Sequence, residues 1–148
     1  MFPQQIVEFI KEHHVLTLAA ANGSDIWCSH AFYAFVEEEL LFVITSEEKT
    51  RHIQLAIESG LYAVEPDSHT VAGAIALETE KVGMIRGLQF KAQISKCDDS
   101  YLNSYRLRYL KRFPYAILKG GDLWLLRLVE VKYTDNRLGF GKKMNWHI

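Results

Sequence analysis

A loop rich in hydroxyl and charged side chains joins an apolar strand to a helix in residues 42–59, FVITSEEKTRHIQLAIES. The start of a helix exposes unpaired backbone N–H groups and the positive end of the helix dipole, a combination that commonly holds phosphate. Lys49 and Arg51 can add charge-assisted hydrogen bonds to phosphate oxygens. The sequence therefore predicts an anion site at this loop.

A second interpretation of the same loop stays open. Lys49 and Arg51 could be solvated side chains at a helix start, where Glu47 and Glu48 match the dipole. Two carboxylates beside a phosphate dianion also cost free energy unless they point away from it. Thr45 and Ser46 could serve only to form a turn or to cap the helix.

No other stretch predicts a catalytic or metal site. The six histidines include no metal-binding spacing such as H-E-x-x-H, so we expect no metal. Cys28 and Cys97 make neither a disulfide framework nor a paired metal motif. We expect Cys28, beside a tryptophan in a strand, to be a small buried hydrophobic residue.

Composition and charge favour one ordinary globular domain over residues 1–148, with 49% hydrophobic and 24% charged residues. The net charge of -1 gives no global attraction to nucleic acid or to anionic lipid, so neither is an expected partner. The N-terminus lacks the pattern of a signal peptide, and no apolar run approaches 18 residues, so we expect a cytoplasmic location and no membrane contact. A basic cluster in residues 106–112 is interpreted as a solvated helix face.

Hydrophobic periodicity predicts elements along the whole chain. Helices are expected from Pro3 to near His14, over residues 51–59 with Thr50 as N-cap, and over residues 100–112. Strands are expected over residues 15–21, 26–36 and 40–45, forming a three-stranded meander, and over 61–65, 82–96 and 123–133. Residues 71–77 could be strand or loop, and the structure of residues 137–148 is left open. We predict an α+β fold, a six- to seven-stranded antiparallel barrel with about three helices.

The succession of these segments resembles the pyridoxamine 5'-phosphate oxidase family. The similar pieces are the N-terminal helix, VLTLAAANGSDIWCSHAFYAFV, LLFVITSEEKTRHIQLAIES and GMIRGLQFKAQI, which cover about the first two thirds of the chain. The whole chain more closely resembles a small bacterial branch of such proteins. The resemblance implies a split β-barrel that binds flavin mononucleotide (FMN) and forms a homodimer with the cofactor at the subunit interface.

The resemblance also implies which residues hold the flavin. Arg86, within a strand, needs a ligand or an acidic side chain as its partner. His30 and His52 would come near the cofactor, without an assigned catalytic role. The implied set, for the phosphate, the ribityl chain and the ring, comprises Ser29, His30, Thr45, Ser46, Lys49, Thr50, Arg51 and Arg86, with Trp146 contacting a flavin held by the partner.

Two departures from the oxidase pattern bear on function. Ser29 and Ala34 stand where the oxidase has an arginine and a lysine, and the Arg-x-His triplet that the oxidase uses for its substrate is absent. Pyridoxine phosphate oxidation is therefore not expected. Two functions remain: an FMN-dependent oxidoreductase acting on a small-molecule redox substrate with unassigned catalytic residues, or a non-catalytic module that binds flavin or haem or has lost its cofactor.

Overall fold

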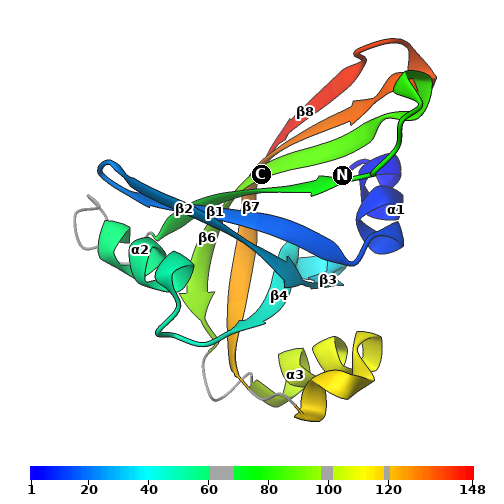
Figure 1. Cartoon of the computed structure of the whole chain (residues 1–148). Coiled ribbons are helices and arrows are strands. Elements are labelled where there is room, and N and C mark those ends of the chain that lie inside the picture. The colour runs from blue at the N-terminus through cyan, green and yellow to red at the C-terminus, as the bar shows by residue number, and fades with distance from the viewer. Residues whose placement is uncertain (61–68, 98–101, 119–120) are drawn as a thin grey trace.

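The computed structural model describes residues 1–60, 69–97, 102–118 and 121–148. In this part of the chain, eight antiparallel strands curl into one sheet and three α-helices pack around it, which confirms the α+β barrel prediction (Figure 1). The strands are β1 Val15–Asn22, β2 Asp25–Phe32, β3 Ala34–Val36, β4 Leu41–Ser46, β5 Thr70–Ala76, β6 Arg86–Lys96, β7 Asp122–Asp135 and β8 Lys143–His147. The helices are α1 Gln4–Glu12, α2 Arg51–Gly60 and α3 Leu102–Arg112, with 3-10 turns η1 Glu37–Glu39, η2 Val82–Met84, η3 Pro114–Leu118 and η4 Asn136–Leu138.

The barrel is closed by a bend in the chain at Tyr33. Neighbouring strands follow the order β2-β1-β5-β6-β7-β4-β3, with β8 added beside β7. β2 and β3 lie at opposite ends of this order although only Tyr33 separates them in sequence. The predictions of one strand over residues 26–36 and of a three-stranded meander were therefore wrong, because β4 pairs with β3 and β7, while β2 pairs with β1.

Hydrogen bonds and burial fix the bend at Tyr33. Its backbone N–H donates to the carbonyl of His14 at 3.0 Å, and its hydroxyl donates to the carbonyl of Ile10 at 2.5 Å. The ring is fully buried, and this burial raises the pKa of the Tyr33 hydroxyl. Arg112 donates to the carbonyl of Tyr33 at 3.1 Å and lies 5.0 Å from its ring centre. The closure point thus joins α1, the sheet and α3.

Two apolar clusters fill the two sides of the sheet. The larger lies inside the barrel and includes Ile6, Phe9 and Ile10 of α1 together with apolar residues of α2. The smaller lies under α3, whose Tyr105 and Tyr109 pack with β3, β4 and the start of β7. The spacing of apolar residues that predicted α1 and α3 therefore marks the buried face of each helix.

The structure adds strands where the sequence left the prediction open. Residues 71–77 fall on β5, and the C-terminal stretch forms η4 and β8, so the strand count exceeds the predicted six to seven. β6, β7 and β8 run beyond the barrel as an arm whose tip carries η2 and η4 (Figure 1). The strand predicted over residues 61–65 and the first residues of the helix predicted over 100–112 lie outside the described residues. No helix in the described part of the chain is long and apolar enough to cross a membrane.

Gly73 of β5 tests how closely the strands pack inside the barrel. A Cβ there would lie 2.2 Å from Cζ of Phe90 and 2.6 Å from the backbone oxygen of Thr17. Because a backbone atom cannot move aside without disturbing the ladder, Gly73→Ala is expected to lower the free energy of unfolding by about 1–3 kcal/mol in urea denaturation. Gly87→Ala is the matched control, since its new Cβ would meet only the oxygen of Ile75 at 3.7 Å. Equal losses in the two variants would contradict the steric explanation.

Candidate functional site

A pocket of about 280 Å³ lies between β2 and β4. In the described part of the chain, β2 pairs with β1 alone, and β3 pairs only with residues 41–43 of β4. The end of β4 therefore faces β2 without a connecting ladder, and we call this unpaired gap the seam. The pocket fills the seam and is lined by Ser29, His30, Ala31, Thr45, Ser46, Glu47, Thr50, His52 and Gly121.

Five of the residues that the sequence nominated meet in this pocket. Ser29 and His30 come from β2, Thr45 and Ser46 from the end of β4, and Thr50 from the turn before α2. The turn brings the start of α2 to the same place, so hydroxyl groups and the first turn of a helix border one space. This arrangement suits an anion or another hydrogen-bond acceptor.

The hydroxyl groups are tied to the imidazole of His52. The Oγ atom of Ser46 lies 2.9 Å from Nε2 of His52 and 3.3 Å from Oγ1 of Thr50, and the last two groups are 3.4 Å apart. Thr50 also donates its hydroxyl to the carbonyl of Glu47 at 2.8 Å, and Trp124 donates its ring N–H to the carbonyl of Ser46 at 3.0 Å. These bonds hold the polar side of the pocket in one geometry.

His52 was expected near the cofactor from the resemblance but was not among the predicted binding residues. Partial burial lowers the pKa of its imidazole, so the neutral form is favoured at neutral pH. Its position in the first turn of α2, directly after the loop, is the only sequence signal that it faces back toward Ser46. His30 stands on the other side of the pocket, where its Nδ1 lies 3.0 Å from Oγ1 of Thr17.

The two cations of the loop do not line the pocket. Lys49 pairs with Glu47 at 3.1 Å, and its side chain is 86% exposed. The guanidinium of Arg51 lies over the ring of Trp27, 4.3 Å from its centre. The lining therefore contains one carboxylate, two imidazoles and no lysine or arginine.

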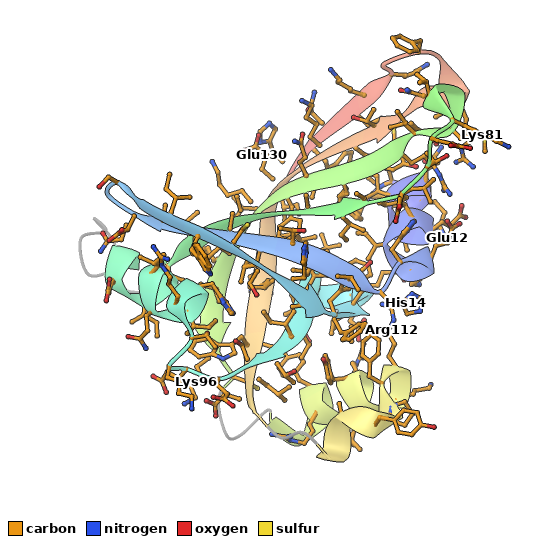
Figure 2. The ribbon with its side chains drawn as sticks, in the orientation of Figure 1. Glu12, His14, Lys81, Lys96, Arg112 and Glu130 are labelled. Carbon is orange, nitrogen blue, oxygen red and sulfur yellow. The ribbon has the colours of Figure 1, made fainter. Side chains whose placement is uncertain are left out.

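Arg86 and Trp146 also lie outside the pocket. Arg86 donates to Glu12 of α1 at 3.2 Å, and the figures show α1 and its labelled Glu12 on the side of the barrel opposite α2 (Figures 1 and 2). An acidic partner for Arg86 was one of the two that the sequence predicted. Trp146 lies in β8, where its ring packs edge-on against Phe2 at 6.2 Å. Neither residue contacts the seam within its own chain.

An apolar groove of about 820 Å³ adjoins the pocket. The two spaces share His30, Ala31 and Thr45, so they lie side by side. The Oγ1 atom of Thr45 is 3.3 Å from the hydroxyl of Tyr109, which links the polar pocket to the aromatic wall. The remaining lining of the groove comprises Val15, Phe32, Arg112, Phe113, Pro114, Tyr115 and Ala116.

The described residues bear on two expectations from the sequence, those for metal ligands and for the two cysteines. No group of three or more histidine, cysteine, aspartate or glutamate side chains gathers there in a way that could hold a metal ion. Cys28 is exposed in β2, so the prediction that it is buried was wrong. Its strand lies at one end of the sheet order and pairs with β1. Cys97 is the buried cysteine.

Comparison with known sequences identifies close relatives. No protein-family model matches the chain. A UPF0306 protein of Yersinia pestis is 38% identical over 141 residues, which span 95% of this chain and 90% of the relative.

Solved structures share the fold at low sequence identity. A heme-binding protein from Mycobacterium smegmatis superposes with a TM-score of 0.74 at 16% identity, over 99% of this chain and 59% of that protein. An FAD-binding protein from Mesorhizobium loti superposes with a TM-score of 0.66 at 9% identity, over 88% of this chain and 92% of that protein. These similarities confirm the split-barrel fold.

The lowered pKa of His52 predicts a contribution to acid sensitivity. The folded protein disfavours protonation of His52, so this residue's contribution to stability is present above its unfolded-state pKa, near 6.5, and is lost as pH falls. His52→Gln should retain a hydrogen bond to Ser46 and lose less stability between pH 7.5 and pH 5 than the wild type, measured by urea unfolding. His147→Gln, at an exposed position of β8, is the control. An unchanged pH dependence in His52→Gln would refute the assignment.

Proposed function

This chain belongs to the UPF0306 family, and we propose that it binds FMN in the seam and groove and acts as a flavin-dependent oxidoreductase on a small molecule. The general claim, that the barrel binds a ligand, is supported by the fold. The specific claims, the identity of the ligand and its use in a reaction, are argued from the residues that line the pocket and the groove.

The adjacency of a polar pocket and an aromatic groove carries the proposal. A ligand that fills both the pocket and the groove needs a small oxygen-rich end and a larger flat apolar end. The link between the two ends would pass the three residues that line both spaces. FMN has this form, with a phosphate, a polar ribityl chain and a planar ring. Each space alone is within or close to the usual size of a small-molecule site. The two similar solved structures are named for heme and FAD, which are also large planar cofactors.

In this proposal the phosphate is held mainly by neutral donors. Ser46 offers its hydroxyl group, and the N-terminus of α2 adds its dipole. The hydroxyl groups of Thr50 and Ser29 donate to the carbonyls of Glu47 and His30, and would turn toward the phosphate when it binds. His30 and His52 stand within the same lining, where an imidazole N–H can donate to a phosphate oxygen. Lys49 and Arg51 remain in the proposal only as cations at the rim, and Arg86 is omitted because Glu12 pairs with it on another side of the barrel.

The groove orients the flat end of the ligand. Phe32 and Phe113 lie 5.2 Å apart there, and Tyr109 packs 5.2 Å from Phe113, so aromatic surface surrounds the ring and excludes water. When bound, the flavin would supply the redox chemistry. The side chains of this chain would bind, orient and shield it, and we assign none of them as a catalytic acid or base.

A second copy of the chain would complete this site. The pairing of β1 with β2 and β5 puts Val15, Ala19, Phe32 and Ala72 on one face of the sheet, and this face is largely exposed. Val15 and Phe32 also line the groove, so a second copy on this face would cover the bound ring. We therefore retain the homodimer in the proposal. In it, Trp146 of the second copy is a candidate for contact with the flavin.

One observation favours a different function, in which the barrel binds a planar ligand without turnover or has lost its cofactor. The pocket lining contains Glu47 and no lysine or arginine, which suits a dianionic phosphate poorly. The absorption spectrum of the freshly purified protein separates flavin from haem. If flavin is bound, its rapid reduction by NADH or NADPH would indicate an enzyme, and no reduction by either would indicate a non-catalytic binding module.

The phosphate assignment predicts a difference between FMN and riboflavin. Ser46→Ala removes a hydroxyl that faces the pocket and should weaken FMN binding by about 1–1.5 kcal/mol, roughly tenfold, while leaving riboflavin binding unchanged. Titrations followed by flavin fluorescence measure both affinities. Ser95→Ala, at an exposed position of β6, is the control. Equal affinity of the wild type for FMN and riboflavin would show that the pocket does not recognise phosphate.

The homodimer predicts that charge on the exposed sheet face will separate the subunits. Ala72→Arg places a cation in the centre of that face and is expected to shift the protein from dimer to monomer in sedimentation at micromolar concentration. FMN affinity should fall with it, because the groove loses its cover. Asn145→Arg adds the same charge at an exposed position of β8 and should leave the dimer intact. A wild-type protein that sediments as a monomer would rule out the interface.

A further inference from the structure

A basic pocket of about 610 Å³ lies on the other side of Arg112 from the groove. Its walls come from α1 and α3, and its floor from β3. Figure 2 shows Arg112 where α3 faces the end of the sheet, close to His14. The lining comprises Lys11, Ala34, Phe35, Arg108, Lys111 and Arg112. Four cations from two helices that are far apart in sequence thus surround one space.

The carboxylates of η1 compensate only part of this charge. Glu37 pairs with Lys11 and Glu38 pairs with Arg108, and all four side chains are about half exposed. Lys111 and Arg112 have no carboxylate within 4.0 Å among the residues that the structure describes. The walls and their two acidic partners therefore carry an excess of two positive charges, which matches a dianion.

Arg112 presents a fixed donor to this space. Its guanidinium donates to the carbonyl oxygens of Tyr33 at 3.1 Å, Lys11 at 3.3 Å and His13. These three bonds use three of the five guanidinium N–H groups, and the main-chain oxygens that accept them carry no formal charge. The bonds hold the side chain in place, and two N–H groups remain for a ligand. The two that remain, on Nε and Nη1, point in different directions, so each can donate a single hydrogen bond to a phosphate oxygen, and the guanidinium adds its positive charge.

We propose that this basic pocket binds the phosphate or pyrophosphate group of a phosphorylated small-molecule substrate. Arg112 lines both this pocket and the aromatic groove, so the substrate's phosphate would be anchored beside whatever occupies the groove. This placement rests on the proposed function, because the flavin ring is the expected occupant. It extends that function by naming the chemical class of the substrate. Four cations suit a multiply charged oxyanion better than they suit a single carboxylate.

The test titrates the full-length protein with inorganic pyrophosphate by calorimetry at low salt. Binding in the micromolar to low millimolar range is expected, and it should weaken as salt is raised. Lys111→Glu should reduce affinity at least tenfold. Lys143→Glu makes the same charge change at an exposed position on the arm and should alter affinity less than twofold. Glu38→Gln frees Arg108 and should tighten binding several-fold.

Three outcomes would overturn the inference: no heat of binding, equal losses in the two lysine variants, or no gain in Glu38→Gln. Flavin titrations of the same proteins keep the two proposals distinguishable. FMN binding without pyrophosphate binding would defeat this inference alone, and pyrophosphate binding without FMN binding would defeat the proposed function alone. If Lys111→Glu weakened FMN and not pyrophosphate, the basic pocket would hold the flavin's own phosphate, and the inference would again be wrong.

Discussion

The structure depends on the way in which Tyr33 closes the barrel. Within the strand order, each strand is hydrogen-bonded to its neighbours. The two ends of the sheet, β2 and β3, are instead joined by Tyr33, a buried residue whose hydroxyl, N–H and carbonyl are all hydrogen-bonded to other elements. Burial of that ring removes its hydroxyl from water, so the bond to Ile10 is costly to lose. α1 and α3 are fixed to the sheet at the same point. The positions of both helices, and of every space between them, follow from this closure.

The proposed ligand site is a consequence of the same closure. Because β2 and β4 are held near each other without a ladder, a gap remains that side chains alone line. Hydroxyl groups at the end of β4 and the start of α2 make one part of it polar, and aromatic residues from α3 and η3 make the neighbouring part apolar. Arg112, which secures the closure, stands between the groove and the basic pocket. Arg112 therefore supports the closure and also lines both spaces proposed to hold ligands.

Much of the fold could be predicted from local sequence. The apolar spacing in α1 and α3 and the hydroxyl-rich loop between β4 and α2 each specify their own structure. The bend at Tyr33 could not be predicted, because residues 26–36 are uniformly favourable for a strand and the break depends on bonds to α1 and α3. The structure of residues 137–148 was left open for a similar reason. The strand β8 is defined by its pairing with β7, and the glycines that precede it in the sequence do not predict a strand.

For the candidate site, the sequence predicted which residues lie near the pocket better than it predicted which way their side chains point. The resemblance placed Ser29, His30, Thr45, Ser46 and Thr50 near one another, and the structure brings them into one lining. Lys49 and Arg51 are in the same loop, but Lys49 pairs with Glu47 and Arg51 lies over Trp27. The contact with Trp27, a residue of β2, cannot be recognised from the loop alone.

The unpaired seam also has a mechanical consequence. The end of β4 pairs with β7, but the edges of β2 and β4 that face the seam have no strand to bond with in the described part of the chain. Local opening there breaks the fewest ladder hydrogen bonds. A ligand bound in the seam would contact both β2 and β4 and so connect the two edges. Occupancy would then stiffen the whole barrel, and the free energy of binding would be added to that of folding.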